Sequence, residues 1–191
     1  MTKRNVEIEK SIMDTSTREK VYKSYFESMI VDGLAKLARE LLGLEAGFTL
    51  VARVAEKGAY ESFKIVMNGA QQRGLDLSSY SLKDILEALI ERLGMGLTGF
   101  ERIIEEEDKY IIEAKKCPYY GKAEGNPVAC GVCVGLVAGM LRRYGLNVRW
   151  VKSPAKKKEL CLSSTRPEYI VYRDPEAKPP YCRVIVERLK C

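Results

Sequence analysis

Apolar residues in the first half of the chain recur every three or four positions, which is the period of an amphipathic helix. This pattern predicts one long helix over residues 17–42, ended by Gly43, and a second over residues 45–73, ended by Gly74. A third helix is predicted over residues 82–93. The first half of the chain is therefore expected to be helical.

The pattern changes near residue 95. Two strand-like runs, 99–105 and 109–115, are separated by three acidic residues and predict a hairpin. Shorter runs at 147–151, 168–173 and 181–189 predict three further strands. Between residues 152 and 167 the chain is basic, and this stretch is expected to be a mobile loop.

One helix interrupts the strands, over residues 128–144, with Gly145 as its end. It is apolar on nearly every side, which predicts that it is buried. Gly131, Gly135 and Gly139 are spaced by four, so they lie on one face. Each costs about 0.5–1 kcal/mol relative to alanine in a helix. Two explanations remain open: close packing against another backbone, or the floor of a ligand cavity.

Helices followed by strands predict an α+β fold. We expect long N-terminal helices packed on a mainly antiparallel sheet of four to five strands, with one central buried helix. Residues 1–16 are predicted to be a flexible N-terminus, and residues 17–191 to be a single domain. Within it, residues 17–94 form the helical half, and residues 95–191 form the sheet with the glycine-striped helix.

Composition narrows the possible chemistry. The chain has no histidine, which excludes Ser-His and Cys-His catalytic pairs and mixed Cys/His zinc sites. Lysine, arginine and glutamate are abundant and amides are few, a composition reported for hyperthermophiles. The net charge of +6 permits nucleic-acid contact, but no helix-turn-helix or ribonucleoprotein motif accompanies it, so we do not expect nucleic-acid binding.

No targeting signal or membrane span is expected. The first ten residues lack the apolar core of a signal peptide. The longest apolar run, residues 128–141, is 14 residues long and is shorter than a membrane span requires. We therefore expect a cytoplasmic protein without membrane attachment.

Six cysteines are the candidate chemical groups. Cys130 and Cys133 form a Cys-x-x-Cys at the start of the buried helix, and three interpretations remain open. They form a redox pair, half of a thiolate metal site, or buried thiols that serve packing or a structural disulfide. A metal site would draw its other ligands from Cys117, Cys161 and Cys182. Cys191, the last residue, is expected to be exposed and incidental.

Residues 94–189 resemble the V4R (4-vinyl reductase) domains, also called hydrocarbon-binding proteins, which share the fold of the TRAPP vesicle-tethering subunits. The resemblance covers the hairpin M-G-L-T-G-F-E-R-I-I-E-E-E-D-K-Y-I-I-E-A, the loop C-P-Y-Y, the helix P-V-A-C-G-V-C-V-G-L-V-A-G-M-L, and the strands G-L-N-V-R-W-V and Y-C-R-V-I-V. The family pattern of a cysteine, a glycine five residues on and another four beyond fits Cys130, Gly135 and Gly139. The resemblance implies a dimeric domain that binds or senses small molecules.

The resemblance also implies a zinc site. In phenol-sensing relatives zinc is held by a cysteine at the helix start, a Glu-x-x-Cys and a cysteine near the last strands. Cys130 matches the first ligand and Cys182 the last. The Glu-x-x-Cys is absent here, because Glu159 and Cys161 have the wrong spacing. Cys117, before a proline, resembles the Cys-Pro with which some archaeal relatives begin the site.

We therefore hypothesise a different thiolate set, with zinc or another thiolate-bound metal in a structural role. Its ligands would be Cys117, Cys130, Cys133 and Cys182, with Cys161 as a substitute.

The predicted function is a small-molecule-binding or sensing domain with an apolar or aromatic ligand, in a homodimer. The domain is expected to be non-enzymatic or only weakly catalytic, and no catalytic residue is assigned. Two alternatives remain: a thiol-disulfide redox protein that uses Cys130 and Cys133, and an assembly subunit without a ligand. The residues expected to contact a ligand are Gly135, Gly139, Phe100, Tyr119, Tyr120 and Trp150.

Overall fold

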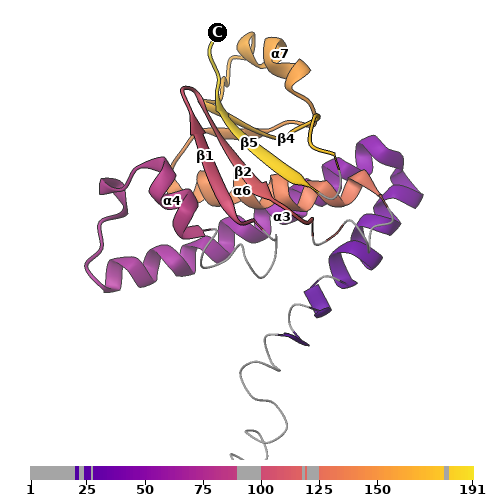
Figure 1. Ribbon diagram of the computed structural model, residues 1–191, viewed down its shortest axis with the longest axis horizontal. Helices are drawn as coiled ribbons and strands as arrows, with labels where there is room; N and C mark the ends of the chain where they lie inside the picture. The colour runs from indigo at the N-terminus through magenta and orange to yellow at the C-terminus, as the bar shows by residue number, and fades with distance from the viewer. Residues whose placement is uncertain are drawn as a thin grey trace, which may run out of the picture.

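A helical hairpin and a five-stranded sheet hold one buried helix between them in the computed structural model of the chain (Figure 1). It describes residues 20–21, 24–26, 28–89, 100–117, 119, 125–178 and 181–191. The helical elements are η1 (Ser28–Ala35), α3 (Lys36–Gln72), η2 (Leu77–Ser79), α4 (Leu82–Leu89), η4 (Pro127–Ala129), α6 (Cys130–Tyr144), η5 (Pro154–Lys156) and α7 (Lys157–Cys161). The strands are β1 (Arg102–Glu106), β2 (Lys109–Ala114), β3 (Val148–Trp150), β4 (Tyr169–Arg173) and β5 (Cys182–Arg188). The α+β fold is confirmed, and the predicted flexible segment 1–16 lies outside the described residues.

The helical half bends where the sequence predicts a break. Gly43 interrupts α3 with a φ of 73°, a left-handed conformation that favours glycine. Beyond this kink the chain turns back, and Gly47 lies so close to the preceding helix that an added Cβ would be 2.8 Å from the carbonyl oxygen of Ala38. The helix ends at Gln72, just before Gly74, whose φ is 71°. The two predicted helices are therefore the two arms of a hairpin.

A capping box begins α4. The Ser81 N–H donates to the Asp84 carboxylate at 2.9 Å, and the Asp84 N–H donates to the Ser81 hydroxyl at 3.2 Å. Both side chains thus satisfy backbone groups at the helix start. The described part of α4 ends at Leu89, and the rest of the predicted helix lies outside the described residues.

The sheet has the strand order β1-β2-β5-β4-β3. All neighbouring pairs are antiparallel except β3 and β4, which are parallel. Residues 151–168, which contain η5 and α7, form the long crossover that a parallel pair requires. The predicted hairpin is confirmed as β1 and β2, joined by residues 107–108. Alternation along β5 places Cys182, Val184 and Val186 on the face that packs on α6.

The central helix is the core of the molecule. Ten residues of α6 are buried, and it ends at Gly145, which has a φ of 108°. By length and composition alone, the segment Pro127–Tyr144 could cross a membrane. However, 67% of that segment is buried inside the protein, which is equally typical of the core helix of a folded domain.

The glycine stripe of α6 faces α3. A Cβ at Gly135 would lie 2.1 Å from the carbonyl oxygen of Ala52, and one at Gly139 would lie 2.1 Å from that of Glu56. Close helix–helix packing therefore accounts for the glycines. The prediction that Gly135 and Gly139 contact a ligand is corrected, since a neighbouring backbone occupies the space on this face.

The outer face of the sheet is covered by the basic stretch, which was predicted to be a mobile loop. Instead it forms η5 and α7. The Lys157 ammonium pairs with Glu187 at 2.6 Å, and Cys161 is bonded to Cys191 in a disulfide. The expectation that Cys191 is incidental is therefore wrong, because the last residue fastens α7 to the end of β5. Sequence spacing could not indicate a pairing across 30 residues.

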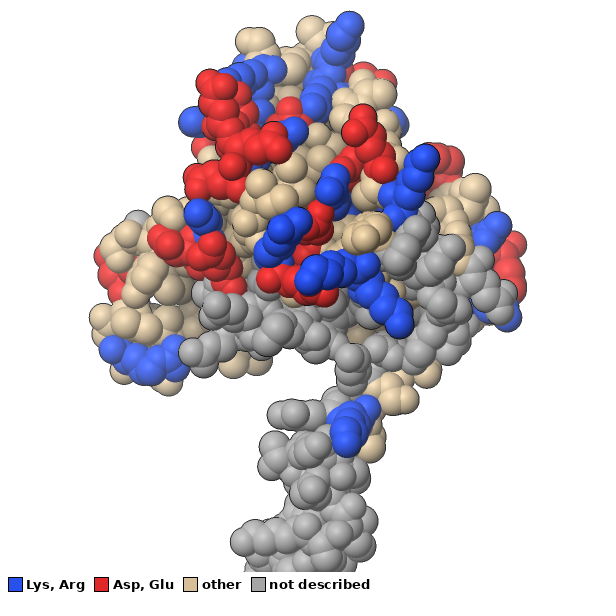
Figure 2. All heavy atoms as spheres, in the orientation of Figure 1, with Lys and Arg blue, Asp and Glu red and all other residues tan. Residues whose placement is uncertain are grey.

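Charges are mixed on the face seen in Figure 2. Lysine and arginine side chains alternate there with aspartate and glutamate, and no continuous basic stripe appears on this face. The described residues form many ion pairs of this kind, including Lys83 with Glu105 and Lys115 with Glu101.

Candidate functional site

Four thiols that are not in disulfides come together at the start of α6. Cys117 follows β2, Cys130 and Cys133 lie in the first turn of α6, and Cys182 begins β5. The register of the sheet explains part of this convergence, because Cys182 pairs with Ala114, near the end of β2. Cys133 and Cys182 are buried, while Cys117 and Cys130 are partly exposed. The thiol set hypothesised from the sequence is therefore brought to one place.

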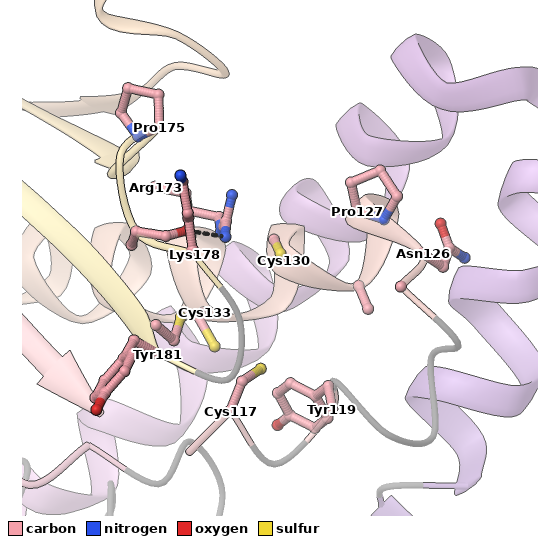
Figure 3. Close-up of a pocket in the computed structure, with 14 residues that line it drawn as sticks. Cys117, Tyr119, Asn126, Pro127, Cys130, Cys133, Arg173, Pro175, Lys178 and Tyr181 are labelled. Atoms are coloured by element: carbon pink, nitrogen blue, oxygen red, sulfur yellow. Dashed lines mark hydrogen bonds between the residues drawn. The ribbon is translucent and has the colours of Figure 1, made fainter. Parts of the chain in front are cut away.

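The thiols border a pocket of about 490 Å³. Ligand-binding clefts commonly measure about 300–1,000 Å³, so the pocket can hold a small organic molecule. In Figure 3, Cys117, Cys130 and Cys133 surround one space, with Pro127 on one side and Arg173 and Pro175 on the other. The pocket is lined by Cys117, Tyr119, Gly125, Asn126, Pro127, Ala129, Cys130, Cys133, Arg173, Pro175, Ala177, Lys178, Tyr181 and Cys182.

Hydrogen bonds between side chains and the backbone hold two walls of the pocket in place. Asn126 is buried, accepts a hydrogen bond from the Val128 N–H at 3.1 Å and donates to the carbonyl oxygen of Ala35 at 3.1 Å. It thereby ties the start of η4 to the helical hairpin. On the other side, the Arg173 guanidinium donates to the carbonyl oxygen of Ala177 at 2.8 Å, which holds the β4–β5 connection in a turn.

Burial opposes ionisation of the Cys130 and Cys182 thiols. It is the main cause that raises the pKa of Cys130; the Arg173 guanidinium lowers that pKa and the neighbouring Cys117 thiol raises it, leaving it above the ordinary value. For Cys182, contact with Cys117 lowers the pKa, but contact with Cys133 and burial raise it more, so its pKa also lies well above the usual range. Reactive cysteines instead have lowered pKa values. This arrangement disfavours thiolate nucleophiles in the absence of a metal.

The donor chemistry of the pocket fits a thiophilic metal. Sulfur ligands favour zinc, copper(I) or iron, and a metal would deprotonate them. Among the residues that the structure describes, however, no three cysteine, aspartate or glutamate side chains are already arranged to hold an ion. Coordination would require the four thiols to rotate toward one another.

The other predicted site residues are distributed over the molecule. Tyr119 is buried and lines the pocket, whereas Phe100 belongs to the hydrophobic core. Tyr120 lies outside the described residues. Cys161, the substitute ligand, is in the disulfide on the outer face of the sheet and is therefore not one of the free thiols.

Trp150 lies in a second, smaller pocket of about 270 Å³. Its indole N–H donates to the buried Glu56 carboxylate at 2.9 Å, and Arg142 donates to the other oxygen of Glu56 at 2.5 Å. Phe48 packs edge-on against the indole, with ring centroids 6.0 Å apart. Because Glu56 lies on α3, Arg142 on α6 and Trp150 on β3, this network joins three elements of the core and is separate from the thiols.

Sequence reasoning missed Arg173 and Lys178. One signal was available: alternation in the strand 169–173 places Arg173 on the same face as Val171, which packs on α6. Lys178 lies in the connection after the strand, where no periodicity indicates a direction. A charged residue at the end of a buried strand could thus have been proposed as a pocket residue.

Together, the fold and the pocket define an α+β domain with a small-molecule-sized, thiol-lined cavity at the start of its central helix. The sequence profile of the family described as methanogen output domain 1 matches residues 54–162, more than half of the chain. The chain belongs to this family, which is related to the V4R domains. A comparison with curated proteins found no match.

Proposed function

We propose that this protein is a small-molecule-sensing domain of the V4R type, with the thiol pocket as its ligand site. The observation that carries the proposal is the pocket of about 490 Å³ between α6 and the β4–β5 connection. Its wall combines prolines, alanines and tyrosines with a few polar groups, which is the usual composition of a ligand site. Membership of a family described as an output domain is compatible with a signalling or sensing role.

A pocket-filling substitution tests this proposal. Ala177 is buried in the pocket wall, on a connection outside the helices and strands, so Ala177→Phe should fill the cavity with little effect on the core. Ala155→Phe, on an exposed site in η5, is the matched control. Fluorinated aromatic fragments observed by ¹⁹F NMR should bind the parent protein and the control but not Ala177→Phe. An unchanged set of bound fragments in Ala177→Phe would contradict the proposal.

A second candidate function for the same thiols is a structural metal site. It is favoured by the convergence of Cys117, Cys130, Cys133 and Cys182 on one pocket. Four thiolates would complete a tetrahedral zinc or iron site and leave no open position for catalysis. Such a metal would hold β2, α6 and β5 together at the edge of the cavity.

Elemental analysis of protein prepared without a metal-affinity tag tests the metal. About one equivalent of zinc or iron is expected, with loss of metal in Cys133→Ser and no loss in Cys161→Ser, whose thiol lies outside the pocket. Zinc and iron both far below one equivalent, with melting unchanged by a chelator, would exclude this site.

The redox alternative has less support. A dithiol oxidoreductase needs an ionised nucleophilic thiol, but burial raises the pKa of Cys130.

We also propose that the domain is a homodimer, which is supported by exposed leucines around the kink of α3. Leu37, Leu41, Leu42 and Leu44, here called the kink leucines, are all exposed. Exposed apolar groups gathered in one place are characteristic of interaction surfaces. A second copy is the simplest partner, since a twofold interface pairs the same apolar residues from both chains.

A further inference from the structure

Two cationic side chains give the thiol pocket a charge that the sequence did not indicate. Arg173 and Lys178 both line it, and no aspartate or glutamate is among its described lining residues. The remaining described lining residues are uncharged or are cysteines.

Neither cation is neutralised by a carboxylate within the described part of the chain. The one hydrogen bond from the Arg173 side chain goes to the carbonyl oxygen of Ala177, which leaves other guanidinium N–H groups available. The adjacent carboxylate, Asp174, instead accepts the Glu176 N–H at 2.9 Å and lies 3.7 Å from Arg183. Asp174 follows the last residue of β4, and its carboxylate is turned toward Arg183 of β5.

The orientation of Arg173 is fixed rather than incidental. It is the last residue of β4, on the face that packs on α6, and its backbone pairs with Val184 of β5. The bond to Ala177 restrains the guanidinium itself. A restrained, planar guanidinium is suited to bidentate recognition of an oxyanion. Lys178 lies in the connection that follows β4, and in Figure 3 both residues are drawn on the β4–β5 side of the pocket.

The opposite wall is apolar. Pro127 and Ala129 belong to η4, which leads into α6, and the buried Tyr119 also lines the cavity. A ligand that fills this space would place an apolar body against these residues and a negative group at Arg173 and Lys178.

We infer that the ligand of the pocket is a small organic acid, with an apolar or aromatic body and an anionic head group held by Arg173 with help from Lys178. This inference rests on the proposed sensing function and sharpens it, because the sequence alone suggested a purely apolar or aromatic ligand. The guanidinium supplies directed hydrogen bonds, and the ammonium supplies a second positive charge.

Matched acid and amide probes test the inference on the full chain. A set of fluorinated benzoates is compared with the corresponding primary benzamides by ¹⁹F NMR, and slower alkylation of Cys130 in the presence of a probe reports that the probe occupies this pocket. The acids should bind about 10-fold more tightly or better, as expected for charge-assisted hydrogen bonds. Their binding should also weaken as salt is added.

Substitutions of Arg173 test whether this residue causes the preference for acids over amides. Arg173→Met should abolish the preference for acids while leaving the binding of the amides unchanged, and Arg173→Lys should retain part of it. Arg149→Met is the control, since Arg149 is an exposed arginine on β3 that does not line the thiol pocket.

The possible outcomes distinguish the sensing proposal from the inference of an acid ligand. Equal binding of acids and amides, with Cys130 protected by both, would overturn the inference and leave the sensing proposal standing. Failure of both probe sets to bind or to protect Cys130 would overturn both. A preference for acids that survives in Arg173→Met would overturn the assignment to Arg173.

Discussion

Glu113 shows how a single side chain can stabilise the sheet. Its carboxylate is buried on β2, where Arg183 donates to one oxygen at 2.9 Å and Arg102 donates to the other at 2.5 Å. Burial of the carboxylate opposes ionisation, but the hydrogen bonds from Arg183 and Arg102 outweigh it and lower the pKa of Glu113. The three residues come from three adjacent strands, so the ionised carboxylate joins β1, β2 and β5.

Because the pKa of Glu113 is lower in the folded state, its contribution to stability is present above the unfolded pKa of about 4.3 and is lost as the pH falls through the folded value. Glu113→Gln should therefore reduce the free energy of unfolding by about 1–3 kcal/mol at pH 7. The difference from the parent protein should shrink below about pH 4. Urea denaturation at several pH values measures both effects.

The control for this prediction is Glu101→Gln. Glu101 pairs with Lys115 at 3.2 Å, but both side chains are largely exposed, so the change in unfolding free energy should stay within about 1 kcal/mol. If Glu113→Gln lowers the free energy of unfolding by the same amount at every pH, the carboxylate acts through its shape rather than its charge.

At the scale of elements, the packing of α6 on α3 depends on the absence of side chains. Gly135 and Gly139 allow the two helix backbones to approach so closely that a single methyl group would overlap a carbonyl oxygen of α3. This close approach also brings Glu56 of α3 within reach of Arg142 of α6. Packing of this kind offsets the conformational cost of glycine within a helix.

Two glycine-to-alanine substitutions of opposite sign follow from this geometry. Gly135→Ala should destabilise the protein by about 1–3 kcal/mol, since the Cβ would lie 2.1 Å from a backbone oxygen. Gly58→Ala, within α3 and with no atom within 4 Å of the added Cβ, should instead stabilise it by about 0.5–1 kcal/mol. Thermal and chemical denaturation measure both. Equal effects of the two substitutions would contradict the close packing.

For the whole molecule, the exposed kink leucines predict association of two copies. The kink leucines lie at the turn of the helical hairpin, and Leu41 is 78% exposed. If a second copy covers them, Leu41→Glu should convert a dimer to a monomer in light scattering coupled to gel filtration, because a charge is costly in an apolar interface. Leu162→Glu, at a residue that is 89% exposed on the opposite side of the sheet, should leave the dimer intact. A dimer that persists in Leu41→Glu would exclude this face.

The sequence by itself predicted the long helices and the five strands in their order along the chain, but not η5 and α7. Helical periodicity, with Gly43 as a break, predicted the two helices on either side of the kink, and strand-like runs predicted the five strands, because both signals are local. Candidate chemistry followed from composition, since without histidine the cysteines were the remaining soft ligands.

Only the tertiary structure decided what each of those residues contacts. It placed α3, rather than a ligand, against Gly135 and Gly139, it joined Cys161 to Cys191, and it brought Cys117 and Cys182 beside the first turn of α6. It also set Arg173 and Lys178 at the same cavity. Such contacts depend on the register of the sheet and on the separation of the helices, which involve residues distant in sequence and leave no local pattern.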